Sequence, residues 1–182
     1  HATLEELALT GQLAQGLGAS ADFRLRQTDF SADGKRGGVP WLGMPIADLD
    51  ALDCVLVVGS FLRKEHPLIA QRLRQAAKRG TQVNVLHCAD DELLMPVANK
   101  SIVAPSALPA ALAALAAVRE GPIGASLAAG KNVAVLIGNF AQQHPQAAQI
   151  HAHAQALAEA LGARLGFLAE AANSVGGYLA GL

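Results

Sequence analysis

The sequence is short of the residues from which most metal and redox centres are built. Its 182 residues include only two cysteines, Cys54 and Cys88, together with one tryptophan and one tyrosine. Two cysteines are too few for a four-cysteine iron–sulfur cluster or a structural zinc site. They also form no disulfide framework, so we expect a reducing compartment. We therefore expect this chain to hold no metal of its own.

The sequence also lacks an excess of positive or negative charge, and it lacks long hydrophobic runs. The formal net charge is −1, and lysine and arginine form no cluster of the kind that binds nucleic acid. Hydrophobic residues make up 52% of the chain, yet the best apolar candidate, residues 106–118, is shorter than the ~20 residues that span a bilayer. We expect neither a nucleic-acid partner nor direct insertion into a membrane.

Charged residues are scarce in the second half of the chain. Residues 101–182 carry three cationic side chains, Arg119, Lys131 and Arg164, and three acidic ones. A surface with so little charge suggests that other protein covers it. An alanine-rich overall composition accounts for the same observation equally well, so both explanations stay open.

Apolar runs and amphipathic segments alternate from about residue 51 onward. The runs 54–58 and 133–137 are continuous and rich in valine, which is typical of parallel strands buried on both faces. Further strands are expected at 83–86, 101–104 and 164–168, and helices at 67–79, 109–118 and 145–161. The alternation predicts an α/β domain over 51–182, a three-layer, doubly wound, mostly parallel sheet of the Rossmann or flavodoxin-like kind. Two βαβ-like halves, about 53–105 and 132–168, share that sheet.

The first 50 residues form a separate region. Thr3 followed by Glu6 is typical of a capping box, and leucines at helical spacing predict a helix over 3–17. Residues 22–27 alternate in polarity and predict a short strand. Residues 30–46 are rich in glycine and proline and predict a loop.

Ligands of open α/β sheets bind at the carboxyl ends of the strands. Glycines follow two of the predicted strands, as Gly59 and Gly138, and would allow a ligand to approach the backbone. Glycine after a buried strand also serves simply to make the turn, and this alternative stays open. The predicted strand ends are Gly59-Ser60-Phe61, His87-Cys88-Ala89-Asp90, Gly138-Asn139-Phe140 and Ala171-Ala172-Asn173.

The sequence pattern does not place histidine and cysteine side chains together in a reactive site. His87 and Cys88 are adjacent on a strand and therefore point to opposite faces. His144 and His151 can share a helix face, but His153 cannot join them and no carboxylate completes a metal site. Because no phosphate-loop, zinc or nucleophile motif is present either, we assign no catalytic, cofactor-binding or metal-binding residue.

Four segments are informative when they are taken together. They are Thr3-Leu4-Glu5-Glu6-Leu7, Asp22-Phe23-Arg24-Leu25-Arg26-Gln27, Leu42-Gly43-Met44-Pro45-Ile46 and Ala172-Asn173-Ser174-Val175-Gly176-Gly177-Tyr178. In order and spacing they resemble the C-terminal region of the G subunit of bacterial NADH–quinone oxidoreductase, respiratory complex I. The resemblance covers essentially the whole chain. That region is similar in fold to a domain of the molybdopterin oxidoreductases, such as formate dehydrogenase.

The resemblance also implies where a cofactor would bind. In molybdopterin oxidoreductases one strand ends in Gly-Ser-Asn, with His-Pro after four further residues, and the next ends in Asp-Pro-Arg. These loops hold the guanine dinucleotide part of the molybdenum cofactor. Here the first loop reads Gly59-Ser60-Phe61 and keeps His66-Pro67, and the second reads His87-Cys88-Ala89. With Phe61 in place of asparagine and His87 in place of aspartate, we expect a vestigial cradle and no cofactor in this chain.

Several further expectations follow from the same resemblance. The chain begins with His1 rather than methionine, so we expect a fragment of a longer subunit. The iron–sulfur clusters of that subunit belong to its cysteine-rich N-terminal region. The implied partners are the rest of the same subunit and other subunits of the peripheral arm of complex I. The implied location is peripheral, on the cytoplasmic side of the bacterial inner membrane.

The implied function is that of a scaffold domain without chemistry of its own. The parent complex passes electrons from NADH through iron–sulfur clusters to quinone and translocates protons. One alternative is the cofactor-binding domain of a molybdopterin-dependent oxidoreductase such as formate dehydrogenase. Another is a free-standing flavodoxin-like nucleotide module, although the chain lacks a phosphate loop.

Overall fold

The computed structural model describes residues 2–24, 28–33 and 38–182 and contains a five-stranded sheet. The strands are β1 Cys54–Val58, β2 Gln82–His87, β3 Asn99–Ile102, β4 Val133–Ile137 and β5 Arg164–Phe167. They lie in the order β3-β2-β1-β4-β5, and every neighbouring pair is parallel. The predicted α/β fold is therefore confirmed, including the pairing of 133–137 with the strands of the first half.

The central strand β1 and its neighbour β4 form the most deeply buried part of the sheet. Every residue of both strands is buried, as their continuous apolar sequences predicted. At the end of β1, Val58 pairs with Leu86 on one side and with Ile137 on the other. This strand order is of the Rossmann kind rather than the flavodoxin kind. The topological switch point, where ligands of such sheets bind, therefore lies between β1 and β4.

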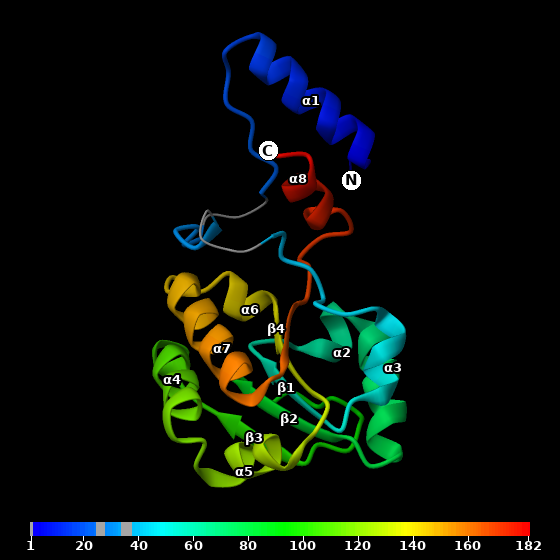
Figure 1. The fold of residues 1–182 in the computed structure, drawn as a ribbon, viewed down its shortest axis with the longest axis vertical. Helices are drawn as coiled ribbons and strands as arrows, with labels where there is room; N and C mark the ends of the chain where they lie inside the picture. The colour runs from blue at the N-terminus through cyan, green and yellow to red at the C-terminus, as the bar shows by residue number, and fades with distance from the viewer. Residues whose placement is uncertain (1, 25–27, 34–37) are drawn as a thin grey trace.

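Helices cover both faces of the sheet, which gives the predicted three layers (Figure 1). One face is covered by α3 Pro67–Lys78 and the 3-10 helix η2 Ile46–Ala51, and the other by α4 Leu108–Val118, α5 Gly121–Ala129 and α7 Ala147–Leu161. Successive strand residues alternate between the two apolar clusters, so that Leu56 lies in one and Val57 in the other. No helix of the described residues is long and apolar enough to cross a membrane.

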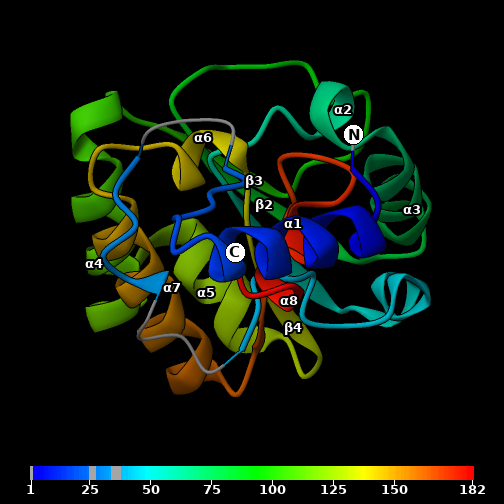
Figure 2. The ribbon, with the colours of Figure 1, turned by 90° about the horizontal axis from the view of Figure 1, so that it is seen from above.

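The N-terminal helix α1 Leu4–Gly16 lies beside the last helix, α8 Ser174–Leu179, beyond the carboxyl edge of the sheet (Figures 1 and 2). It begins with the predicted capping box, in which Glu6 N–H donates to Thr3 Oγ1 and Thr3 N–H donates to the Glu6 carboxylate. Although α1 packs against α8, none of its residues is buried.

The short strand predicted over residues 22–27 is wrong for the part that the structure describes. Residues 22–24 form no strand, and residues 25–27 lie outside the described residues. The Asp22 carboxylate accepts hydrogen bonds from both the backbone N–H and the Nε–H of Arg24. This local contact takes up the backbone donor that a strand ladder would need.

Segment 41–43 covers the outer edge of β5 and so replaces a further strand. Phe167 N–H donates to the Trp41 carbonyl at 2.8 Å. Gly43 has a φ of +76°, and a Cβ at this position would collide with the Leu165 carbonyl. Only glycine fits this close approach of two backbones. The Trp41 side chain remains 48% exposed while its backbone closes the sheet edge.

A buried polar network joins three strands to α5. The amide of Asn84, a fully buried residue of β2, donates to Cys54 Sγ at 3.1 Å and to Ser126 Oγ at 3.0 Å. Its Oδ1 accepts a hydrogen bond from Asn99 Nδ2 of β3 at 2.8 Å. A buried amide is costly unless its polar atoms are paired, so this network specifies the register of the short strand β3.

We expect the substitution Asn84→Ala to lower the free energy of unfolding by about 1–3 kcal/mol, because it leaves buried partners unpaired. Urea denaturation followed by circular dichroism measures the change. The exposed Gln82→Ala on the same strand is the matched control and should change the free energy by less than about 0.5 kcal/mol. Equal effects of the two substitutions would contradict a specific role for the network.

Candidate functional site

The loops at the carboxyl ends of β1 and β4 meet at the switch point. Gly59 follows β1 with a φ of +61°, and a Cβ there would lie 2.7 Å from the backbone nitrogen of Ala141. A Cβ at Gly138 would collide with the Ser60 side chain and lie 2.6 Å from the Gly59 carbonyl oxygen. The two glycines therefore allow the two loops to touch each other, which leaves no room for a ligand between them.

Short helices continue both loops away from the sheet. These are α2 Leu62–Glu65 after β1 and α6 Asn139–Gln142 after β4. Ser60 is buried, and its hydroxyl donates to the Glu65 carboxylate at 2.6 Å, which holds the first loop in a tight turn. The sequence pattern did not predict either helix, because four residues are too few for a helical period to be recognised.

Phe61 lies in the first loop at the position where the resemblance implies an asparagine. The ring is half-buried and packs against the apolar cluster that contains Leu62, Leu93 and Leu168. The Arg63 guanidinium lies 5.5 Å from the ring centroid. An apolar ring packed in this way offers no hydrogen bond to a guanine or a ribose.

Four buried polar atoms at the same edge have no hydrogen-bond partner among the described residues. They are Arg63 Nε, His66 Nε2, His87 Nδ1 and Asn139 Oδ1. His87 ends β2, Arg63 lies in α2, His66 directly follows α2, and Asn139 begins α6. Because an unpaired buried polar atom costs about 1–3 kcal/mol, this edge would stabilise polar groups supplied from outside the chain.

Of the histidines singled out in the sequence, His87 and His144 both contact the Phe140 ring, whereas His151 lies elsewhere. His87 Nε2 lies 3.3 Å from the Asp91 carboxylate, while Cys88 packs against the apolar cluster that contains Leu86. His144 Nδ1 accepts from Gln146 N–H, so its Nε2–H donates to a backbone carbonyl. His151 contacts the Phe167 ring. Among the described residues, no three potential metal ligands come together.

A cavity of about 410 Å³ lies over the carboxyl ends of β4 and β5. Four of the six phenylalanine and tyrosine rings in the chain line it, namely Phe23, Phe30, Phe167 and Tyr178. Sequence reasoning did not find this cavity, because its walls come from segments near both ends of the chain. The only available signal was that so few aromatic residues occur and that they cluster near residues 23–30 and 167–178.

The cavity is also lined by acidic side chains. Asp29, Asp33 and Glu170 contribute carboxylates, whereas Arg24 is the one arginine or lysine among the described residues that line it. Arg24 already pairs with Asp33 at 3.3 Å and with Asp22 at 2.7 Å. The Asp22 carboxylate raises the pKa of the Arg24 guanidinium above its ordinary value. The Asp33 carboxylate in the wall of the cavity is therefore already paired with a cation.

Comparison with known proteins identifies the family of this chain. A model of the molybdopterin oxidoreductase family matches residues 1–181. Two similar curated proteins are the alpha subunits of F420-dependent formate dehydrogenases from Methanococcus maripaludis and Methanocaldococcus jannaschii. Each is 39% identical over 41 residues, which are 22% of this chain and 6% of the length of that subunit.

A solved structure shares the fold. The chain is similar to part of the formyltransferase/hydrolase complex of Methylorubrum extorquens, solved in complex with methylofuran, with a TM-score of 0.59 and 18% sequence identity. The similar region covers 88% of this chain and 49% of that one. The chain thus spans about half of the structural relative and a small part of the curated relatives.

We expect Gly138→Ala to destabilise the protein by about 1–3 kcal/mol, the usual cost of inserting a methyl group into a packed site. The added Cβ would meet the Gly59 carbonyl, which belongs to the backbone and cannot rotate away. Gly16→Ala is the control, because nothing lies within 4 Å of its Cβ position at the end of α1. Thermal unfolding should show a clear loss only for Gly138→Ala; a neutral result would mean that the two loops can separate freely.

Burial lowers the pKa of the His66 imidazole below its ordinary value, which is about 6.5 in an unfolded chain. Below that pH the unfolded chain takes up a proton that the folded protein resists, so stability is lost as the pH falls from about 7 toward the lowered pKa. We expect His66→Gln to lose less stability than the original protein between these pH values. Urea midpoints measured across the range test this, and identical slopes would contradict it.

Proposed function

Because the chain belongs to the molybdopterin oxidoreductase family, we propose that it is one domain of a larger oxidoreductase and that its own role is structural. The observation that carries this proposal is the closed carboxyl edge. The loops after β1 and β4 contact each other through Gly59 and Gly138, at the switch point where a sheet of this kind binds its ligand.

The molybdopterin guanine dinucleotide that the family implies does not fit the residues present. At Phe61 an apolar ring packs against the core of the domain in place of a polar side chain. The loops that would hold it contact each other at Gly59 and Gly138. In this proposal the chain therefore takes no part in chemistry on that cofactor.

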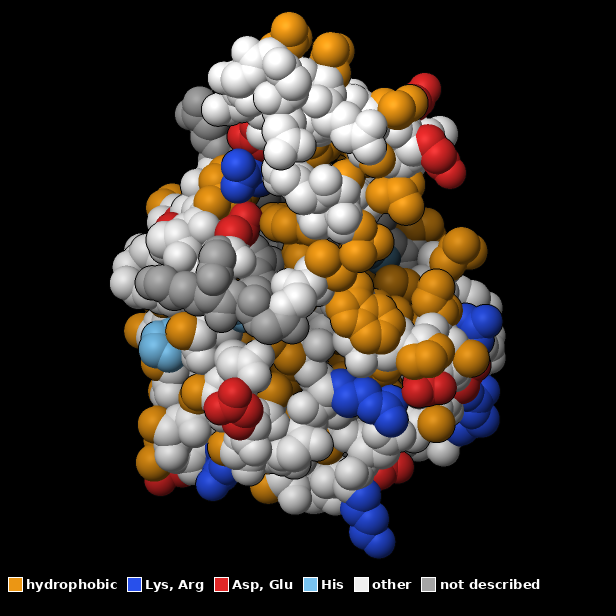
Figure 3. Space-filling view, turned by 45° about the horizontal axis from the view of Figure 1, so that its top comes forward, with side chains coloured by type: hydrophobic (Ala, Val, Ile, Leu, Met, Phe, Trp, Pro, Cys, Tyr) orange, Lys and Arg blue, Asp and Glu red, His pale blue; other side chains and the backbone are white. Residues whose placement is uncertain are grey.

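Exposed apolar side chains support a position inside a larger assembly. Leu9 and Leu13 of α1 and its C-cap Leu17 recur at helical spacing, and each is more than 60% exposed. Leu68 of α3 is 82% exposed. Figure 3 shows apolar side chains gathered over one face of the molecule, with charged side chains around its margin. Soluble proteins rarely leave such surface uncovered, which favours contact with other protein.

The parent that we propose is the G subunit of bacterial NADH–quinone oxidoreductase. This proposal rests on the resemblance of the segments around Leu4, Arg24, Met44 and Gly176 to that subunit. It is more specific than the match to the molybdopterin oxidoreductase family. The partners would be the rest of that subunit and other subunits of the peripheral arm. The domain would lie on the cytoplasmic side of the inner membrane, while iron–sulfur clusters elsewhere in the subunit carry electrons from NADH toward quinone.

A second candidate is a cofactor-binding domain of a formate dehydrogenase-like enzyme. The similarity to two formate dehydrogenase alpha subunits favours this kind of protein over complex I. The unpartnered buried atoms of Arg63, His66, His87 and Asn139 also favour it, because a bound polar group would satisfy them. The two candidates differ in one measurable property, which is whether guanine nucleotides bind to the carboxyl edge.

Isothermal titration calorimetry with GMP and GDP separates the two candidates. For the structural domain we expect no saturable heat at sub-millimolar nucleotide, because the loss of two or three polar contacts weakens binding by a factor on the order of 10³. Saturable micromolar binding would reject the structural role and establish the cofactor-binding candidate, provided that His87→Ala weakens it. The Leu9→Ala variant, altered at an exposed position of α1, is the control for non-specific heat.

A further inference from the structure

The aromatic cavity over β4 and β5 has the size of a small-molecule site. Its volume of about 410 Å³ lies within the range of about 300–1,000 Å³ that is typical of ligand pockets. Phe23, Phe30, Phe167 and Tyr178 line it, and each of these side chains is half-buried, so that part of its surface remains accessible. The cavity therefore offers aromatic surface to a molecule that enters it.

Protein contacts hold these rings in place. Phe23 and Tyr178 meet edge to face, with ring centroids 4.9 Å apart. The Phe23 ring lies directly against the backbone of α8 at Gly177, where a Cβ would collide with it. Phe167 meets the His151 ring edge to face, with centroids 5.2 Å apart. Rings that are already ordered lose little conformational freedom when a ligand binds, which favours affinity.

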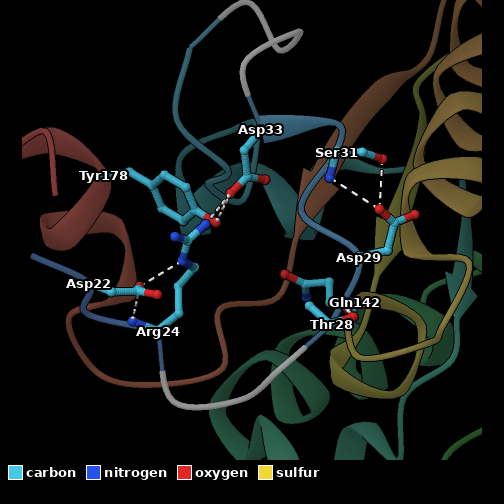
Figure 4. Close-up of polar contacts among 8 residues, drawn as sticks. All are labelled: Asp22, Arg24, Thr28, Asp29, Ser31, Asp33, Gln142 and Tyr178. Atoms are coloured by element: carbon cyan, nitrogen blue, oxygen red, sulfur yellow. Dashed lines mark hydrogen bonds and ion pairs between the residues drawn. The ribbon is translucent and has the colours of Figure 1, made fainter. Parts of the chain in front are cut away.

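The polar side chains beside Phe30 are paired with one another. The Asp33 carboxylate accepts a hydrogen bond from Tyr178 Oη–H at 3.0 Å and pairs with Arg24 Nη1 at 3.3 Å (Figure 4). Arg24 Nε also pairs with the Asp22 carboxylate at 2.7 Å. The Arg24 guanidinium lies 4.1 Å from the centroid of the Phe30 ring, which is a cation–π contact. These charges are thus engaged within the protein.

Polar side chains elsewhere in the wall have partners as well. The Asp29 carboxylate accepts from Ala148 N–H, in the first turn of α7, at 3.2 Å. Gln142 Nε2–H donates to two backbone carbonyls at the ends of β4 and β5, and Gln143 Nε2–H donates to the Glu170 carboxylate at 2.8 Å. None of the four unpartnered buried atoms belongs to the described residues of this wall. A charged ligand would give up its hydration for partners that are already engaged.

We propose that this cavity binds an uncharged, mainly apolar small molecule that carries an aromatic ring. The ring of the ligand would pack against the side-chain rings in offset-stacked or edge-to-face contacts. Among its described lining residues the site includes none of Phe61, His66 and His87. It is therefore independent of the structural role proposed above, and guanine nucleotide binding and binding in this cavity are measured separately.

The dye N-phenyl-1-naphthylamine tests the proposal, because it is uncharged at neutral pH and its fluorescence rises in apolar surroundings. We expect saturable binding to the intact chain at micromolar dye. The related dye 1-anilinonaphthalene-8-sulfonate has the same rings and adds an anionic group, so it should bind at least about tenfold more weakly. Equal or tighter binding of the sulfonate would overturn the assignment of an uncharged ligand.

Two substitutions in α7 place the dye in the cavity. Ala148 lines the cavity, so the larger side chain of Ala148→Phe should fill it and abolish saturable binding. Ala152 is exposed, lies one turn further along α7 and is not among the described lining residues, so Ala152→Phe should leave binding unchanged. Near-ultraviolet circular dichroism verifies that each variant remains folded.

A pair of substitutions at Tyr178 tests the contact with the rings. Tyr178→Leu removes a ring from the wall and should weaken binding roughly three- to tenfold, whereas Tyr178→Phe keeps the ring and should weaken it less than about twofold. The proposal is overturned if the intact chain shows no saturable binding of the uncharged dye, if the folded Ala148→Phe variant binds it as the original protein does, or if the two Tyr178 variants behave alike.

Discussion

The backbone contact between the loops after β1 and β4 determines the arrangement of the whole carboxyl edge. Gly59 and Gly138 bring these loops within van der Waals distance, so that α6 starts directly beside the end of β1. This closes the switch point and moves the available space outward, to the region over β4 and β5 where the aromatic cavity lies. In this domain the edge at which such folds usually bind their ligands is packed, and the cavity lies to one side of it.

Much of the fold could be predicted from the sequence, because its strongest signals come from burial. The runs at β1 and β4 are apolar throughout since both faces of each strand are covered, and no local pattern competes with them. Thr3 and Glu6 identified the start of α1 correctly because a capping box is a purely local device. The order of the five strands, in contrast, depends on crossovers that the sequence pattern does not specify.

The candidate site was less accessible to sequence reasoning. Phe61 and His87 were found because they stand at strand ends, where a motif can be compared position by position. The cavity was not found, because Phe23 and Tyr178 approach each other only after the sheet has brought the two ends of the chain together. Asp29 at the start of α7 was likewise invisible, since tertiary capping has no fixed spacing in sequence.

The covered edge of β5 has a consequence for how this domain can join others. Segment 41–43 lies against β5 as a strand would, although it continues neither the sheet nor its hydrogen-bond ladder. A further strand from elsewhere in a parent assembly is therefore excluded at that end. At the opposite end lies β3, which pairs only with β2 among the described strands. The sheet can be extended in one direction only, beyond β3, whose register against β2 is fixed by the part-buried Asn84–Asn99 hydrogen bond.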